Sequence, residues 1–119
     1  MIAAGRGSER GSASILVLAI GLLLVAAGAA GAAVGAARVA RHQARTAADL
    51  GALAGAVHVI EGRAVACAAA ERLVIANGAA IVSCEVRDLD LVVRVEVTVP
   101  GLPGPARAAA RAGPVSTPV

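Results

Sequence analysis

Uncharged and mostly apolar residues occupy the sequence without interruption from Gly11 to Ala37, with an arginine on either side. A helix of this length, at about 1.5 Å per residue, extends roughly 40 Å, whereas the hydrocarbon core of a bilayer is ~30 Å thick. The pattern therefore predicts a single transmembrane helix over residues 12–37. The short polar segment before it, residues 1–11, is predicted to be a disordered tail.

A secretory signal peptide is the alternative explanation of this N-terminal pattern. Arg6 and Arg10 precede the apolar residues, and the small residues from Ala27 to Ala33 contain two Ala-x-Ala sequences. The uncharged run, however, is longer than the ~7–15 apolar residues of an ordinary signal peptide. The helical pattern also continues to Ile60. Both observations favour a retained anchor over a removed signal.

Beyond the apolar run the helical pattern becomes amphipathic, which extends the predicted helix from Ala13 to Ile60. The apolar stripe comprises Ala47, Leu50, Leu53, Ala54, Val57 and Ile60, and the polar stripe comprises Arg38, Arg41, Arg45 and Asp49. Glu61 and Gly62 interrupt the pattern. A second helix is predicted from Ala64 to Ala76, ended by Asn77-Gly78. Its predicted inward face comprises Cys67, Ala70, Leu73 and Val74.

After this second helix the apolar period changes from 3.6 to 2, which predicts a β-hairpin with one apolar face. The inward residues are Val82, Cys84, Val86, Val93, Val95, Val97 and Val99. Opposed residues must share a face, so the expected pairs are Val86 with Val93, Cys84 with Val95, and Val82 with Val97. The loop then comprises Leu89 and Asp90, or residues 88–91. This register places Glu85 opposite Arg94 on the solvent face.

The C-terminal segment, residues 100–119, contains all five prolines and is expected to be an irregular arm. A short third strand or a helical turn is expected around residues 106–112. The predicted fold class is α+β: a long transmembrane helix continues into an amphipathic helix, and a short helix packs on an antiparallel hairpin. Residues 38–99 form the small extracytoplasmic module of this fold.

The composition excludes several classes of partner. The chain of 119 residues has no Phe, Tyr or Trp, so it lacks the side chains on which single-stranded nucleic acids stack. Its net charge of +3 comes from scattered arginines without any lysine. No dense basic cluster points to nucleic-acid binding. Neither a nucleic acid nor a small-molecule substrate is expected as a partner.

The two cysteines carry the clearest chemical hypothesis. Cys67 lies on the predicted second helix and Cys84 on the inward face of the following strand, so packing of helix on sheet would bring them together. A disulfide closing this loop is worth roughly 3 kcal/mol in chain-entropy models. The alternative is two buried free thiols that act as small hydrophobic residues. The bridge is favoured because a small, aromatic-free module needs a covalent constraint and the apolar leader indicates an oxidising compartment.

No catalytic, cofactor-binding or metal-binding constellation is predicted. His42 and His58 lack the spacing of metal ligands. Ser83 points outward from a predicted strand without a nucleophile motif around it. Asp88 and Asp90 flank the hairpin loop, where aspartates are common turn residues. The protein is therefore not expected to be an enzyme.

Three glycines in the apolar run suggest a helix-packing surface. Gly28, Gly31 and Gly35 lie along one side of the predicted helix, and Gly31 and Gly35 match the small-x-x-x-small pattern. Small residues in this pattern let membrane helices approach each other closely.

The segment from Arg10 to Ala13 before an apolar helix, followed by the run RHQARTAADLGALA from Arg41 to Ala54, resembles the N-terminal region of TadE/TadG-like proteins of tight-adherence (Flp) pilus systems. Cys67, the turn Asn77-Gly78-Ala79, and Cys84 before a Val-rich strand resemble more narrowly the small actinobacterial TadE-like proteins encoded beside a helicase and secretion genes. The resemblance extends from about Arg10 to Val99, and its Ala-Ala-Asp-Leu segment is the most specific part.

The resemblance implies a membrane-anchored minor pseudopilin or assembly component of a pilus or secretion system. Its partners would be other pilin-like subunits, an inner-membrane secretion platform and membrane lipid. Leu16 occupies the position at which processed pseudopilins usually carry Glu, counted from Gly11, so processing after Gly11 is not predicted.

The expected location is the cell membrane, with a single pass and the C-terminal domain outside the cytoplasm. Arginines Arg38, Arg41 and Arg45 after the span by themselves favour the opposite orientation. The cysteine argument and the resemblance together favour the extracytoplasmic one. The alternative function is a small secreted effector or binding protein, released by signal peptidase near Ala33.

Overall fold

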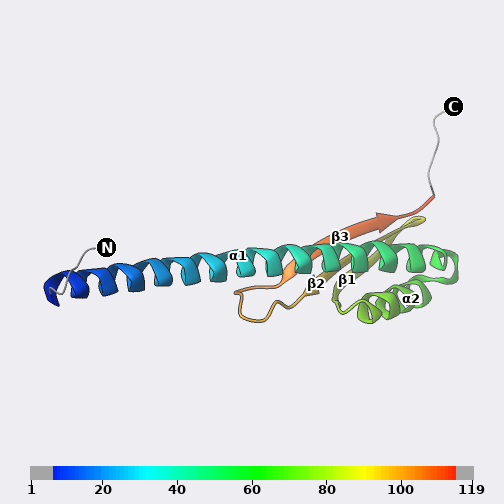
Figure 1. Ribbon diagram of the computed structural model, residues 1–119. Helices are drawn as coiled ribbons and strands as arrows, with labels where there is room; N and C mark the ends of the chain where they lie inside the picture. Colours follow the sequence, from blue (N-terminus) through cyan, green and yellow to red (C-terminus); the bar gives the residue numbers. More distant parts are fainter. Residues whose placement is uncertain (1–6, 115–119) are drawn as a thin grey trace, which may run out of the picture. The chain divides into compact units, whose positions relative to one another are not determined.

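The structure is a computed structural model that describes residues 7–114, with side chains described from Gly11 onward. It has the predicted α+β class: α1 (Gly7–Ala56), a 3-10 turn η1 (Val59–Glu61), α2 (Arg63–Ala76) and strands β1 (Ala80–Arg87), β2 (Asp90–Val97) and β3 (Ala106–Ala112) (Figure 1). The chain divides into two compact units, Met1–Gly35 and Ala36–Val119.

The first unit contains the apolar part of α1. The large side chains from Ile15 to Val25 are exposed along this part of the helix. Among the residues described, one helix is long and apolar enough to cross a membrane, and it is this one, from Gly11 to Ala56. Helix α1 begins at Gly7, before the expected start at Ala13. The expected disordered tail thus includes residues that are helical, and its first part, residues 1–6, lies outside the residues described.

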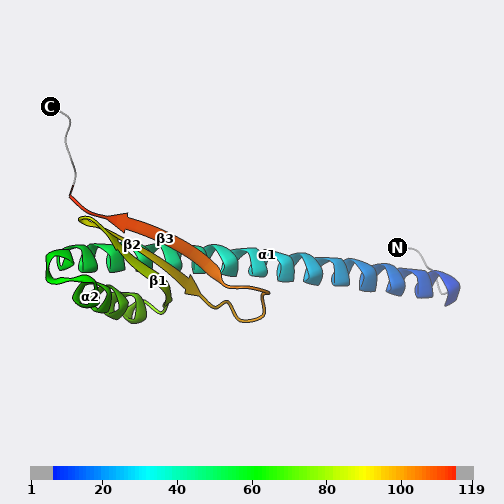
Figure 2. The same cartoon turned by 180° about the vertical axis from the view of Figure 1, so that it is seen from behind.

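The second unit is a two-layer module in which helices cover one face of an antiparallel sheet. The strand order is β1-β2-β3, so β2 is central (Figure 1). Viewed from behind, α2 lies alongside the last turns of α1 (Figure 2). The core between the layers is lined on β2 by Leu91, Val93, Val95 and Val97, all buried. The alternate residues of β2, such as Arg94, face away from the helices.

Alanine and glycine, rather than large apolar residues, form the buried face of α1. The buried residues are Ala40, Ala44, Ala47, Ala48, Gly51, Ala52 and Gly55. The predicted apolar stripe was therefore wrong for most of its members: Leu53 is 61% exposed, Val57 75% and Ile60 90%. Ala47 is the member of that stripe that is fully buried. Large side chains are excluded from the buried face because the opposing backbone is too close.

Two glycines of α1 show how close that approach is. A Cβ atom at Gly51 would lie 2.7 Å from Val74 Cγ2, and a Cβ atom at Gly55 would lie 2.7 Å from Leu91 Cδ1 and 2.8 Å from the backbone oxygen of Ala66. Real side chains do not tolerate such distances, so any other residue would push α2 or β2 away from α1.

Helix α2 forms almost as the sequence predicts. It begins after Gly62, whose φ of 108° is unfavourable for other residues, and it ends at Asn77-Gly78, where Gly78 has a φ of 76°. The amide of Ala79 donates to the carbonyl of Val74 at 3.1 Å, which satisfies the helix end. The buried residues are Ala66, Ala69, Ala70 and Val74, while Cys67 and Leu73 are half-buried.

The β1–β2 hairpin has a two-residue loop, but its register differs from the predicted one. The structure pairs Cys84 with Val93, and Arg87 with Asp90. The loop is therefore Asp88-Leu89, with Asp88 in the left-handed region at a φ of 54°. The predicted pairs, including Glu85 opposite Arg94, were wrong, although a shift of two residues keeps the predicted apolar face. An aspartate tolerates this backbone conformation, which explains why the turn forms one residue earlier.

A bulge near the start of β1 also changes one predicted core residue. The register shifts between Ile81 and Ser83, and Val82 is left without a paired residue in the ladder. Val82 is 56% exposed, whereas Ile81 packs against the core. The extra residue of a bulge reverses the alternation of the strand, so the predicted inward position of Val82 was wrong.

The expected irregular arm contains a regular strand. Residues Ala106–Ala112 pair antiparallel with β2, for example Ala109 with Arg94, which realises one of the two alternatives for this segment. Its even-numbered alanines pack against the core and its odd-numbered residues are exposed. Small side chains therefore suffice for the inward face of this strand.

We expect Gly55→Ala to destabilise the module by about 1–3 kcal/mol, because the added methyl group overlaps the Ala66 carbonyl oxygen. The same change in an open helix would be favourable by ~1 kcal/mol. Leu53→Ala, at an exposed position two residues away, should change stability by only about 0.5 kcal/mol. Hydrogen exchange of β2 amides in the micelle-bound chain measures both values. The reverse order would mean that the large apolar stripe is the buried one.

Candidate functional site

The apolar part of α1 presents the predicted helix-packing glycines on an open surface. A Cβ atom at Gly28, Gly31 or Gly35 would meet no heavy atom within 4 Å. The surrounding large side chains, such as Leu24 and Val25, are exposed as well. This surface is available for contact with lipid or with another helix, and the role of the three glycines remains a prediction.

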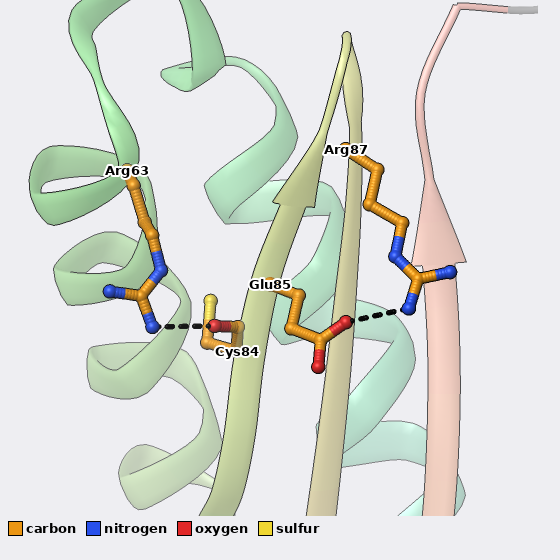
Figure 3. Close-up of polar contacts among 4 residues, drawn as sticks. All are labelled: Arg63, Cys84, Glu85 and Arg87. Carbon is orange, nitrogen blue, oxygen red and sulfur yellow. Dashed lines mark hydrogen bonds and ion pairs between the residues drawn. The ribbon is translucent and has the colours of Figure 1, made fainter.

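A covalent bridge joins the two layers of the module. Cys67 on α2 and Cys84 on β1 form a disulfide with an S–S distance of 2.07 Å and a Cα–Cα distance of 5.9 Å. One turn earlier on α2, Arg63 Nη2 donates a hydrogen bond to the carbonyl oxygen of Cys84 at 3.1 Å (Figure 3). The disulfide and the hydrogen bond together hold the first half of α2 against the sheet edge.

A side-chain hydrogen bond holds the other end of α2. Gln43 on α1 donates from Nε2 to the carbonyl oxygen of Asn77 at 3.0 Å, across a large separation in sequence. Asn77 in turn donates from Nδ2 to the carbonyl oxygen of Leu73 at 2.8 Å. Together these contacts fix the turn between α2 and β1 against α1.

The sheet face that points away from the helices carries paired charges. Arg87 Nη2 lies 3.0 Å from Glu85 Oε2 on the same strand (Figure 3), Arg107 Nε lies 3.7 Å from Glu96 Oε2, and Arg111 Nε donates to Asp90 Oδ2 at 2.8 Å. The arginines and Glu85 are exposed, and Glu96 and Asp90 are half-buried, so each pair remains in contact with solvent and stabilises the fold by only ~1 kcal/mol. The face therefore has the features of a solvated surface.

The remaining residues weighed from the sequence are not brought together. His42 is exposed on α1, and His58 Nδ1 pairs with the Glu61 carboxylate at the end of the helix. Ser83 is half-buried on β1, and Asp88 forms the hairpin turn. Across the described residues, no group of three or more His, Cys, Asp or Glu side chains could hold a metal ion.

An exposed apolar patch lies at the C-terminal end of α1. It is formed by Leu53, Val57, Ile60 and Leu89, and it borders an open pocket of about 580 Å³ that Gly113 and Pro114 also line. Sequence reasoning placed most of these residues inside. The sequence contained one signal for their exposure, a second stripe of Ala and Gly on the same helix. These small residues allow close packing, so their face of the helix is the buried one.

The family model "Putative Flp pilus-assembly TadE/G-like" matches residues 11–58. This match covers the apolar run and the amphipathic part of α1, and it ends before α2 and the sheet. No curated protein and no solved structure matches the chain. The similarity therefore concerns the apolar helix and its continuation into the module.

We expect removal of the disulfide to reduce the free energy of unfolding of the module by roughly 3 kcal/mol, because the bridge closes a loop with a sequence separation of 17. The comparison is between the oxidised chain and a Cys67→Ser/Cys84→Ser double variant in urea. Wild-type protein treated with a reductant is the control and should match the double variant. Equal stability of the oxidised and reduced protein would contradict this contribution.

Proposed function

We propose that this protein is a non-enzymatic, membrane-anchored component of a Tad/Flp-like pilus or secretion system, acting as a minor pseudopilin or an assembly subunit. The observation that carries the proposal is the family match over residues 11–58. This single match covers both the apolar half and the amphipathic half of α1. Proteins of pilus assembly systems act by contact with other subunits, and the chain offers exposed helix surface for such contact.

The proposed location of the module is outside the cytoplasm. The support is the Cys67–Cys84 disulfide, since such bridges persist in oxidising compartments and are rare in the cytosol. Residues 12–37 then cross the membrane once, and residues 1–11 begin on the cytoplasmic side. The module of residues 38–99, together with β3 from the C-terminal arm, is displayed at the outer surface.

The proposed partners are other pilin-like subunits and an inner-membrane secretion platform, with lipid around the span. The open surface at Gly28, Gly31 and Gly35 supports close helix–helix contact within the bilayer. In the module, Leu53 and Val57 provide a second exposed apolar surface. As a structural component, the protein would contact its partners through the glycine surface and through the surface at Leu53 and Val57.

A second candidate function is a small secreted binding protein. One observation favours it: the compact module begins at Ala36, shortly after the small-residue tract that ends at Ala33. Cleavage there would release the whole module and remove the apolar segment. The mass of the mature protein distinguishes the candidates, because the anchored protein keeps this segment and remains in membranes through alkaline carbonate extraction.

We expect a membrane-impermeant maleimide to label Cys67 and Cys84 on intact cells only after mild reduction, because both thiols are oxidised and outside. The measurement is the mass of the labelled protein with and without reductant. Cells opened before labelling are the control for total accessible thiol. Free thiols that react only in opened cells would contradict the proposed orientation.

We expect the double variant Gly31→Leu/Gly35→Leu to lose crosslinks to pilin-like subunits while staying in the membrane, because bulky side chains prevent close approach of helices. The matched control is Ala26→Leu/Ala30→Leu, which has the same spacing on another side of the helix. Crosslinked species are quantified after isolation of membranes. Equal crosslinking by both double variants would show that the glycines do not form the interface.

A further inference from the structure

A notch of about 200 Å³ lies at the point where α1 enters the module. One wall is formed by Ala37 and Arg41 of α1, and the other by the loop that connects β2 to β3. The residues that line it on this side are Val99, Leu102, Pro103, Gly104 and Pro105 of the loop, and Ala106, the first residue of β3. Ala37 is also the last residue of the uncharged run. If the run spans a bilayer, as the proposed function requires, Ala37 and the wall of the notch that it forms lie close to the lipid headgroups.

Within the described part of the chain, the α1 wall of the notch supplies positive charge that no carboxylate balances in an ion pair. Arg41 is exposed, and so is Arg38 one turn before it. Among residues 11–114 neither guanidinium takes part in an ion pair, whereas Arg45 lies 3.9 Å from the carboxylate of Asp49. Residues three or four apart on a helix share a face, so these arginines lie on one side. The side of the notch at Arg41 is therefore suited to an anion from outside the chain.

The loop wall is apolar and carries no charge. From Val99 to Ala106 the sequence contains valine, leucine, alanine, proline and glycine only. Gly101 and Gly104, with φ of 80° and 83°, allow two sharp turns, and the Leu102 amide donates to the Val99 carbonyl at 3.2 Å. Leu102 is half-buried and packs against the core. The loop is thereby held beside Arg41 with prolines exposed at the rim.

We propose that this notch binds the headgroup of an anionic phospholipid in the bilayer that surrounds the span. The ligand chemistry follows from the two walls: a guanidinium forms paired hydrogen bonds with a phosphate, and an apolar wall accommodates the glycerol and the first acyl methylenes. Juxtamembrane arginines also attract anionic lipid surfaces in general. The notch adds a defined place for one headgroup and assigns the contact to Arg41.

The test is a lipid titration of the full, oxidised chain in detergent micelles, followed by native mass spectrometry. The probes are phosphatidylglycerol and phosphatidylcholine with the same acyl chains. Wild-type protein should retain phosphatidylglycerol preferentially, and Arg41→Gln should lower that affinity about fivefold while leaving phosphatidylcholine unchanged. Arg41→Lys, which keeps the charge but loses the planar fork, should lie between the two.

The matched control is Arg87→Gln, which removes the same charge from the hairpin end of the module, where β1 ends. Its phosphatidylglycerol affinity should equal that of the wild type. An equal loss of phosphatidylglycerol affinity in Arg87→Gln and Arg41→Gln would overturn the proposed headgroup site, because it would show an effect of net charge alone. Displacement of the lipid by free glycerol 3-phosphate at similar concentration would also overturn it, since the site would then recognise a soluble phosphate.

Failure of this inference is distinguishable from failure of the proposed function. The same protein is first mixed with vesicles of each lipid, and the membrane-bound fraction is measured after carbonate treatment. A chain that inserts into both vesicles but retains the two lipids equally overturns only the headgroup site. A chain that inserts into neither overturns the membrane anchor and the headgroup site together.

Discussion

The close approach of α1 to α2 and the sheet is the constraint on which the module depends. With no aromatic residue in the chain, the core consists of alanine, valine, leucine and glycine, and small side chains fill space only when backbones come near each other. Gly51 and Gly55 permit that approach, because a single added carbon at either position would overlap its neighbours. The exposure of Leu53 has the same cause, because the face of α1 with small residues is the one that packs against α2 and the sheet.

A core of this kind buries little area per residue, so the module depends on cross-links that act over long sequence separations. The disulfide between Cys67 and Cys84 ties α2 to β1, and the hydrogen bond from Gln43 to Asn77 ties the same connection to α1. Small domains with limited cores commonly use covalent bridges in this way. The charged pairs on the outer sheet face add little stability, and they keep that face soluble.

The proposed role as an anchored pilus or secretion component draws on surfaces rather than on a catalytic centre. The apolar part of α1 offers glycines in open space, and the module has its own exposed apolar patch, which includes Leu53 and Val57. Near Ala37 the character of α1 changes, with an exposed arginine, Arg41, beside an apolar loop.

Local sequence signals determined the elements, and tertiary packing determined their faces. The charge-free run predicted the membrane-competent helix, Asn77-Gly78 predicted the end of α2, and alternating valines predicted the hairpin, because each signal depends on neighbouring residues only. The inward face of α1, the register of the hairpin and the outward turn of Val82 required the structure. The space between backbones decides the inward face of α1, the left-handed Asp88 sets the hairpin register, and a bulge turns Val82 outward. Hydrophobic periodicity encodes none of these. The cysteine pairing lay between these cases: the sequence favoured it, and the packing of α2 on β1 brought the two sulfurs together.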